Sequence, residues 1–163
     1  MSQTLHIPVN VSREEAYVQL TPQLIALFKG ESNLYANAAN FSAFVFATFG
    51  FHWVGFYWVH EVDLVLGAFQ GPIACTRIAK GKGVCGTAWL NNETIVVPDV
   101  EAFPGHIACS PLSKSEIVIP IRNSQRDVIG VLDIDSAVAN DFSMVDRNAL
   151  ELWVRILEEA CHG

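Results

Sequence analysis

Five segments with the composition of β-strands occupy the middle of the chain, and helical patterns flank them at both ends. These segments are rich in aromatic and β-branched residues and span residues 52–60, 62–69, 94–97, 116–121 and 127–134. The first two follow one another closely, and a polar turn at 123–126 joins the last two. Short connections pair neighbouring strands antiparallel, so a central, mostly antiparallel sheet is predicted.

Helical spacing of apolar residues predicts helices over residues 13–29, 32–48 and 143–159. Ser12 is expected to cap the first helix, and Pro22 to split or kink it. Amphipathic helices bury their apolar stripe against another layer. We therefore predict an α+β fold, in which the N- and C-terminal helices pack on one face of the sheet and the loops lie on the other.

The bulk composition predicts a single domain that spans all 163 residues. Hydrophobic residues make up 51% and charged residues 17%, enough apolar material for a packed core. The net charge of −7 disfavours nucleic acid and anionic membranes as partners. Neither a signal segment nor an apolar run of membrane-spanning length is visible, so a cytoplasmic protein is expected.

Four cysteines, Cys75, Cys85, Cys109 and Cys161, form the first group that could carry chemistry. A cytosolic core of this size needs no disulfide framework, so they are expected to be buried thiols, metal ligands or redox groups. Tightly spaced ligand pairs typical of zinc are missing, apart from a weak hint at His106 and Cys109. We expect no metal site.

The surroundings of each cysteine favour different interpretations. Cys75 and Cys85 have cations nearby in sequence, and a short helix is predicted over residues 87–90, just after Cys85. Cations and helix N-termini lower a thiol pKa, but burial as small apolar side chains is equally compatible. Cys109 lies in a long irregular loop, 100–115, which favours function. Cys161 is interpreted as a buried thiol.

Three carboxylates form the second group. Glu116 opens one predicted strand, and Asp133 and Asp135 stand two apart near the end of another. Residues two apart on a strand point to the same side, so the two aspartates face one place. They are either solvated charges at a strand end, or a pocket that binds a cationic amine or holds a proton at raised pKa.

Aromatic residues form the third group, in the predicted strand 52–60. Alternation places Trp53 and Tyr57 on one side with Gly55 between them, and Phe56 and Trp58 on the other. A glycine between two large rings predicts a recess, although core packing also explains such a pattern.

The order of these groups resembles the free methionine-R-sulfoxide reductases, a branch of the GAF-domain family. The matching stretches are Trp-Val-Gly-Phe-Tyr (53–57), Gly-Pro-Ile-Ala-Cys (71–75), Gly-Lys-Gly-Val-Cys-Gly (81–86), Pro-Asp-Val (98–100), Phe-Pro-Gly-His-Ile-Ala-Cys (103–109), Ser-Glu-Ile-Val-Ile-Pro (115–120) and Gly-Val-Leu-Asp-Ile-Asp-Ser (130–136). The resemblance covers nearly the whole chain, and the cysteine set is specific to this branch.

The resemblance implies a GAF-like fold and a thiol-dependent reductase for free methionine (R)-sulfoxide. It implies that Cys109 is the nucleophile and that Cys75 resolves the sulfenic acid, with Cys85 as alternative or relay. Thioredoxin is the implied transient reductant, and no cofactor is bound.

The remaining site residues follow from matching this substrate to the chain. Trp53 and Tyr57 are expected to line the pocket for the S-methyl end. Glu116 or Asp135 is expected to donate the proton, while the other carboxylates, Asp133 among them, hold the ammonium.

Two other classes of function remain open. A stand-alone GAF domain that binds a small molecule or senses redox state has the same fold, although sensors usually accompany an output domain for which 163 residues leave no room. A structural protein with incidental cysteines is the third hypothesis. The sequence also leaves open whether the chain acts alone or as a homodimer.

Overall fold

The computed structural model describes residues 4–107 and 110–162 and has the predicted α+β architecture. Its centre is a six-stranded antiparallel sheet with the order β3-β2-β1-β6-β5-β4. The strands are β1 (Trp53–His60), β2 (Asp63–Gln70), β3 (Arg77–Ala79), β4 (Ile95–Val97), β5 (Ser115–Arg122) and β6 (Val128–Ser136). Five of them match the predicted segments closely. The three-residue β3, with Ile78 as its one buried residue, is too short to produce a strand pattern and was not predicted.

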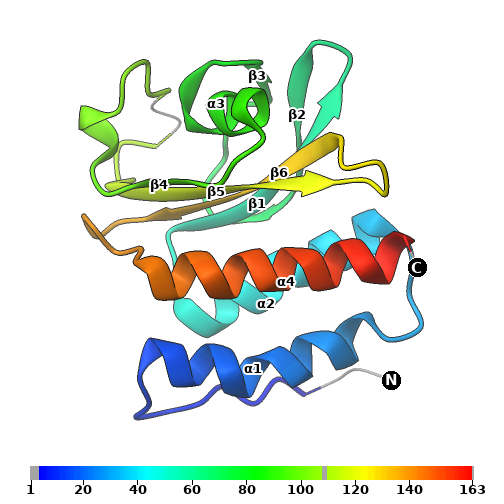
Figure 1. Cartoon of the computed structure of the whole chain (residues 1–163). Helices are drawn as coiled ribbons and strands as arrows, with labels where there is room; N and C mark the ends of the chain where they lie inside the picture. The colour runs from blue at the N-terminus through cyan, green and yellow to red at the C-terminus, as the bar shows by residue number, and fades with distance from the viewer. Residues whose placement is uncertain (1–3, 108–109, 163) are drawn as a thin grey trace.

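Three long helices lie on one side of the sheet, as predicted: α2 (Leu34–Phe49) and α4 (Met144–His162) pack on the sheet, and α1 (Arg13–Phe28) packs on these two helices (Figure 1). Their apolar sides join the sheet in a core centred on side chains such as Phe41, Phe56 and Trp153. Ser12 caps α1 as expected, in a capping box with Glu15. This layer anchors the sheet and leaves its other face to form the site.

Pro22 does not split α1, contrary to the expectation from the sequence. A proline removes the hydrogen bond that its N–H would donate to the carbonyl four residues earlier. That carbonyl belongs to Val18, which is 69% exposed, so water can take the place of the missing donor. The helix therefore continues to Phe28.

The opposite face of the sheet carries the short helix α3 (Gly83–Asn91), next to the edge strand β3, and the loops around residues 98–114 (Figure 1). The long loop contains one turn of 3-10 helix, Val100–Ala102. A second apolar cluster, which includes Trp89 and Val118, packs α3 against the sheet. Helix α3 begins earlier than the predicted 87–90, and it includes Cys85 in its first turn.

Strand register decides which side chains reach this second face. Glu116 of β5 pairs with Asp135 of β6, and Val118 pairs with Asp133. The intervening Ile117 and Ile134 belong to the core under the helices. Alternation along both strands therefore brings the three carboxylates together on the side of α3 and the loops.

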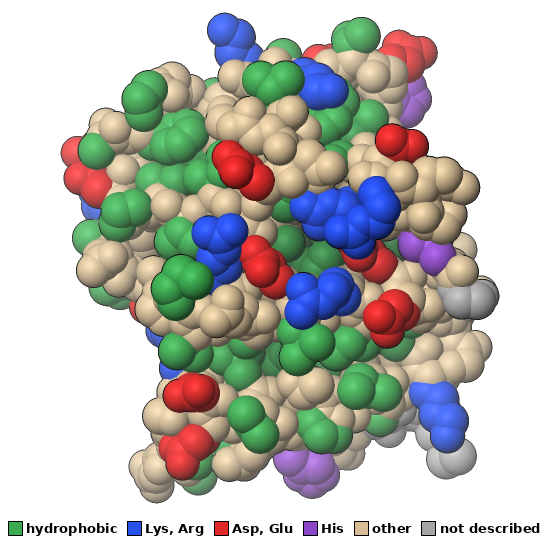
Figure 2. Space-filling view, in the orientation of Figure 1, with side chains coloured by type: hydrophobic (Ala, Val, Ile, Leu, Met, Phe, Trp, Pro, Cys, Tyr) green, Lys and Arg blue, Asp and Glu red, His purple; other side chains and the backbone are tan. Residues whose placement is uncertain are grey.

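The acidic net charge is unevenly distributed. Basic side chains gather over α4 and the neighbouring strand ends in the view of Figure 2. Four of the six arginines of the chain line one groove there, namely Arg122, Arg126, Arg147 and Arg155. The groove includes Ile119 and Val154 of the helix-side core, so it is separate from the loop face. Among the described residues, no helix is both long and apolar enough to cross a membrane.

Candidate active site

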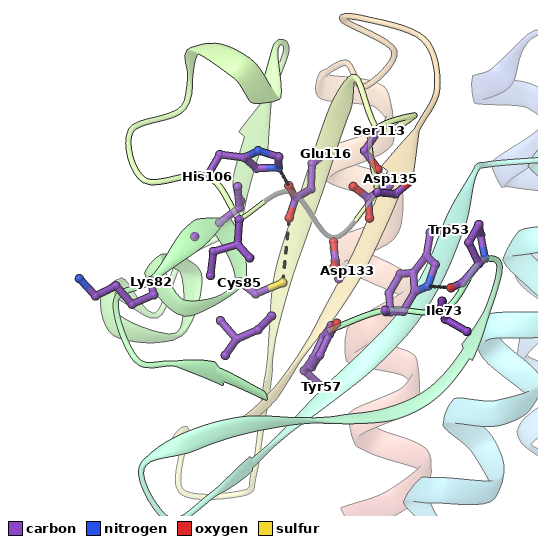
Figure 3. A pocket seen from close by; sticks show the side chains of 17 residues that line it. Trp53, Tyr57, Ile73, Lys82, Cys85, His106, Ser113, Glu116, Asp133 and Asp135 are labelled. Carbon is purple, nitrogen blue, oxygen red and sulfur yellow. Dashed lines mark hydrogen bonds and ion pairs between the residues drawn. The ribbon is translucent and has the colours of Figure 1, made fainter. Parts of the chain in front are cut away.

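A pocket opens on the loop face of the sheet, between β1, β5, β6, α3 and the loop segments around Pro72 and His106 (Figure 3). Its polar floor consists of Glu116, Asp133 and Asp135, and its apolar wall includes Trp53 and Tyr57. The sheet fixes the floor, while the loops form the rim. The structure thus brings together the carboxylates and aromatic residues that the sequence singled out.

The carboxylates are buried rather than solvated at a strand end. Glu116 is 5% exposed and Asp133 is 7% exposed. One carboxylate oxygen of each and the sulfur of Cys85 all lie within 4.8 Å of one another. Among the described residues, Asp133 Oδ1 is the one buried side-chain polar atom without a hydrogen-bond partner. A buried oxygen left without a partner is costly, so the pocket is built to receive a donor or a cation.

Burial and mutual repulsion raise the pKa values of these acids. Burial raises the pKa of Glu116 well above its usual value, and the neighbouring charges of Asp133 and Asp135 raise it further. The pKa of Asp133 is also raised well above its usual value, by burial and then by Asp135. Burial raises the pKa of Asp135 to about 6, against an opposing hydrogen bond from Ser113. The site can therefore hold protons near neutral pH.

The surroundings of Cys85 favour one of the two interpretations that the sequence left open. The residue is 3% exposed, and burial, followed by the charges of Asp133 and Glu116, raises its thiol pKa well above the usual value. Its Sγ donates to Glu116 Oε1 at 4.0 Å. Two of the cations nearby in sequence have other partners, since Lys80 stacks on Trp89 at 4.8 Å and Arg77 pairs with Asp63 at 3.4 Å, while Lys82 lines the pocket. This environment favours a buried neutral thiol over an activated thiolate.

The other cysteines occupy different environments. Cys75 is disulfide-bonded, and its carbonyl accepts a 2.9 Å hydrogen bond from the hydroxyl of Tyr57. Cys109, the predicted nucleophile, lies outside the described residues, but its sequence neighbours Ile107 and Ser110 line the pocket. Cys161 is half-buried in α4 and accepts a 3.6 Å hydrogen bond from Asn37. Cys161 therefore lies on the helix side, away from the pocket.

The aromatic wall is a stack of rings. The Trp53 ring stacks on Tyr57 at 5.9 Å and on Phe69 at 5.3 Å between centroids. A side chain on Gly55 would clash with the Trp53 ring and with Phe69, both at 2.4 Å. The recess expected at Gly55 is thus filled by Trp53 itself, and this lays the indole flat against the pocket. Its Nε1 donates to the carbonyl of Pro72 at 3.0 Å.

Several pocket residues were missed from the sequence. His106 Nε2 lies 3.9 Å from Glu116 Oε2, and burial lowers the pKa of this histidine. Ser113 reaches Asp135, and Ser110 Oγ is 2.9 Å from His52 Nε2. These residues lie in a loop without periodicity, so no pattern marked them. His106 could have been suspected only from its place three residues before Cys109.

The raised pKa of Asp135 predicts a stability change with pH. Because its folded pKa of about 6 exceeds the unfolded value of roughly 3.9, ionisation in the folded state costs stability as pH rises above about 4, and the full cost is reached above pH 6. We expect Asp135→Asn to raise the free energy of unfolding by about 1–3 kcal/mol at pH 7.5 and by much less at pH 4. Urea denaturation at both pH values checks this, with the exposed Asp127→Asn as control. An equal effect at both pH values would contradict it.

Comparison with known proteins places this site in a family. The GAF domain family matches residues 43–160. Free methionine-R-sulfoxide reductase of Escherichia coli is 43% identical over 150 residues, which cover 91% of this chain and 90% of the relative. The chain belongs to the free methionine-R-sulfoxide reductase branch of the GAF-domain family. The resemblance drawn from the motifs is therefore confirmed.

Other members of the family agree with the sequence and the fold. GAF domain-containing protein A of Dictyostelium discoideum is 55% identical over 148 residues, covering 90% of this chain and 93% of the relative. The X-ray structure of free methionine-R-sulfoxide reductase from Neisseria meningitidis in complex with its substrate has a TM-score of 0.93 and 44% identity. It covers 97% of this chain and 95% of that one. The GAF-like fold expected from the sequence is confirmed.

Proposed function

We propose that this chain reduces free methionine (R)-sulfoxide to methionine with its own cysteines. The observation that carries the proposal is the convergence of Glu116, Asp133 and Asp135 on one pocket beside an aromatic wall. Two relatives, from Saccharomyces cerevisiae and Escherichia coli, are named free methionine-R-sulfoxide reductase. The substrate's ammonium, sulfoxide and S-methyl groups match the polar and apolar sides of the pocket.

The first chemical step breaks the sulfoxide S–O bond. The thiolate of Cys109 attacks the sulfoxide sulfur while an acid protonates the oxygen. Methionine leaves as the oxygen passes to Cys109 as sulfenic acid. The sulfoxide gains two electrons, and the cysteine sulfur loses two.

The second step converts the sulfenic acid of Cys109 into a disulfide. The thiol of Cys75 attacks the sulfenic sulfur, a water molecule leaves and a Cys75–Cys109 disulfide forms. Support for Cys75 rather than Cys85 comes from three features: Cys75 is disulfide-bonded, Cys85 is a free thiol, and burial raises the pKa of Cys85. A thioredoxin-type dithiol, of the kind that the cytoplasm can supply, then reduces the disulfide. No bound cofactor takes part.

The carboxylates divide between proton donation and amine binding. Glu116, whose pKa burial raises well above its usual value, is assigned as the donor. Asp135, with a pKa of about 6, is assigned to the ammonium together with Asp133. Burial also raises the pKa of Asp133, and the positive charge of a bound ammonium favours its ionised form. The orphaned Asp133 Oδ1 gains a partner in this arrangement. The three carboxylates of this arrangement line one pocket of a single chain.

This assignment explains why a free amino acid is preferred. A peptide-bound methionine brings no ammonium, and the buried carboxylates would lose the partner that offsets their burial. A site built around a charged group discriminates in kcat/KM, by a large factor, against an analogue that lacks this group.

Substrate comparison tests the proposal. Wild-type protein with thioredoxin, thioredoxin reductase and NADPH is assayed with free R-sulfoxide, free S-sulfoxide and N-acetylated R-sulfoxide. We expect turnover with the free R epimer and a loss of at least ~100-fold with the other two. A small-molecule or redox-sensing GAF domain predicts no catalytic turnover with any of them, and equal rates with the acetylated compound would contradict the role of the carboxylates.

Trp53 provides a prediction about substrate affinity. Trp53→Phe keeps a ring against Phe69 and Tyr57 but removes the hydrogen bond to Pro72. We expect KM to rise about tenfold, with a loss of about 1 kcal/mol in the free energy of unfolding. Trp89→Phe is the matched control, since Trp89 is buried in the same cluster but does not line the pocket. A rise in KM of the same size in the control would instead indicate a packing effect.

A further inference from the structure

Three side chains of types that ligate metal ions lie close together in the pocket. The Cys85 sulfur and one oxygen each of Glu116 and Asp133 lie within 4.8 Å of one another. His106 Nε2 lies 3.9 Å from Glu116 Oε2 and stands beside this set, outside it. Figure 3 shows these side chains converging from α3, the long loop, β5 and β6. Their positions in the sequence give no ligand spacing, so only the fold brings them together.

The spacing of the three atoms allows one zinc ion after small side-chain movements. Zinc binds nitrogen and oxygen at about 2.0–2.2 Å and thiolate at about 2.3 Å, so neighbouring ligand atoms lie roughly 3.3–3.8 Å apart. The Cys85 Sγ–Glu116 Oε1 separation is 4.0 Å, and all three ligand atoms lie within 4.8 Å of one another. Side-chain rotations that shorten these separations by up to about 1 Å would give three protein ligands and leave the fourth tetrahedral position open to water.

One buried oxygen of the cluster lacks a hydrogen-bond partner among the described residues. Asp133 is 7% exposed, yet its Oδ1 has no hydrogen-bond partner among the described residues. No lysine or arginine forms an ion pair with any of the three carboxylates in the described part of the chain. Where these buried acids ionise, a cation that enters from solution would offset their charge.

We propose that this pocket binds Zn²⁺ through Cys85, Glu116 and Asp133, and that the bound metal inhibits the enzyme. The inhibitory part rests on the proposed function, because the metal occupies the carboxylates assigned to the substrate's ammonium and proton transfer. Cys85 is a free thiol while Cys75 is disulfide-bonded, so the ligand set does not require reduction of that disulfide. Mg²⁺ and Ca²⁺, which require six or more oxygen ligands, do not fit it.

Cobalt provides a spectroscopic probe that needs no catalysis. Co²⁺ is titrated into the Cys75→Ser/Cys109→Ser double variant, which leaves Cys85 and Cys161 as the only thiols. We expect one equivalent to bind with the thiolate charge-transfer band and intense visible bands of a tetrahedral site, and Zn²⁺ to bleach them. Adding Cys85→Ser should remove the charge-transfer band and weaken binding by at least ~10–100-fold, whereas adding Cys161→Ser should change neither.

The outcomes separate the metal site from the proposed function. If the Cys85→Ser addition prevents folding, judged by circular dichroism, Glu116→Gln serves as the second variant and should also lose the tetrahedral spectrum. Absence of a charge-transfer band, or its persistence after Cys85→Ser, overturns the metal site while leaving the reductase proposal intact. Free methionine sulfoxide should compete with the metal and raise the apparent Kd for Co²⁺. If Co²⁺ binds without such competition, the metal site stands, but the metal does not share the substrate position and does not inhibit the enzyme.

Discussion

Cys109→Ser should abolish even a single turnover, with a loss of roughly 10⁴-fold or more in the rate of methionine formation. A serine hydroxyl is not ionised near neutral pH and cannot carry the oxygen as a sulfenic acid, so no downstream step compensates for the change. The measurement is single-turnover methionine formation from free R-sulfoxide by pre-reduced protein without thioredoxin.

Two matched variants sharpen this result. Cys75→Ser should still produce one methionine per chain, because it keeps the nucleophile and loses only the resolving thiol. Cys161→Ser should behave as wild type, since Cys161 lies in α4 on the helix side of the sheet. Methionine formation by Cys109→Ser at a rate similar to that of wild type would show that another thiol attacks the sulfoxide.

Glu116→Gln should lower kcat by about 10²–10⁴-fold, the range that general acid catalysis supplies, with a smaller change in KM. The wild-type rate should fall as pH rises through the pKa of Glu116, which burial and the neighbouring aspartates raise well above its usual value. The variant should lose this dependence, because the amide does not titrate.

Asp135→Asn serves as the internal comparison for Glu116→Gln. It should raise KM more than it lowers kcat, because Asp135 is assigned to the ammonium. Glu93→Gln, at an exposed position lining the arginine groove, should change neither constant. A larger loss of kcat in Asp135→Asn than in Glu116→Gln would indicate instead that Asp135 donates the proton and Glu116 binds the ammonium.

The fold was largely predictable because its signals are local. Residues 115–122 and 128–136 alternate between the helix-side core and the pocket, so strand periodicity alone placed Asp133 and Asp135 on one side, whereas the place of Glu116 beside them depends on the pairing of β5 with β6. The continuation of α1 past Pro22 was not predictable, because it depends on Val18 facing solvent. In the same way, β3 depends on its pairing with β2.

The site was predictable where regular strands carry it and not where loops do. The sequence left open whether Cys85 lies near cations or is buried as a small apolar side chain; in the structure Lys80 stacks on Trp89 and the carboxylates of distant strands surround the thiol. His106 reaches Glu116 from a loop without periodicity. Such electrostatic environments depend on tertiary contacts, which no window of sequence contains.

A thiol count tests the central claim most directly. Pre-reduced wild-type protein is mixed with one equivalent of free methionine (R)-sulfoxide without reductant, and free thiols under denaturing conditions and methionine are quantified together. The account predicts loss of two thiols for each methionine formed, with Cys85 and Cys161 still free and Cys75 linked to Cys109 in the peptide map. Methionine formed without thiol loss, or no methionine at all, would contradict it.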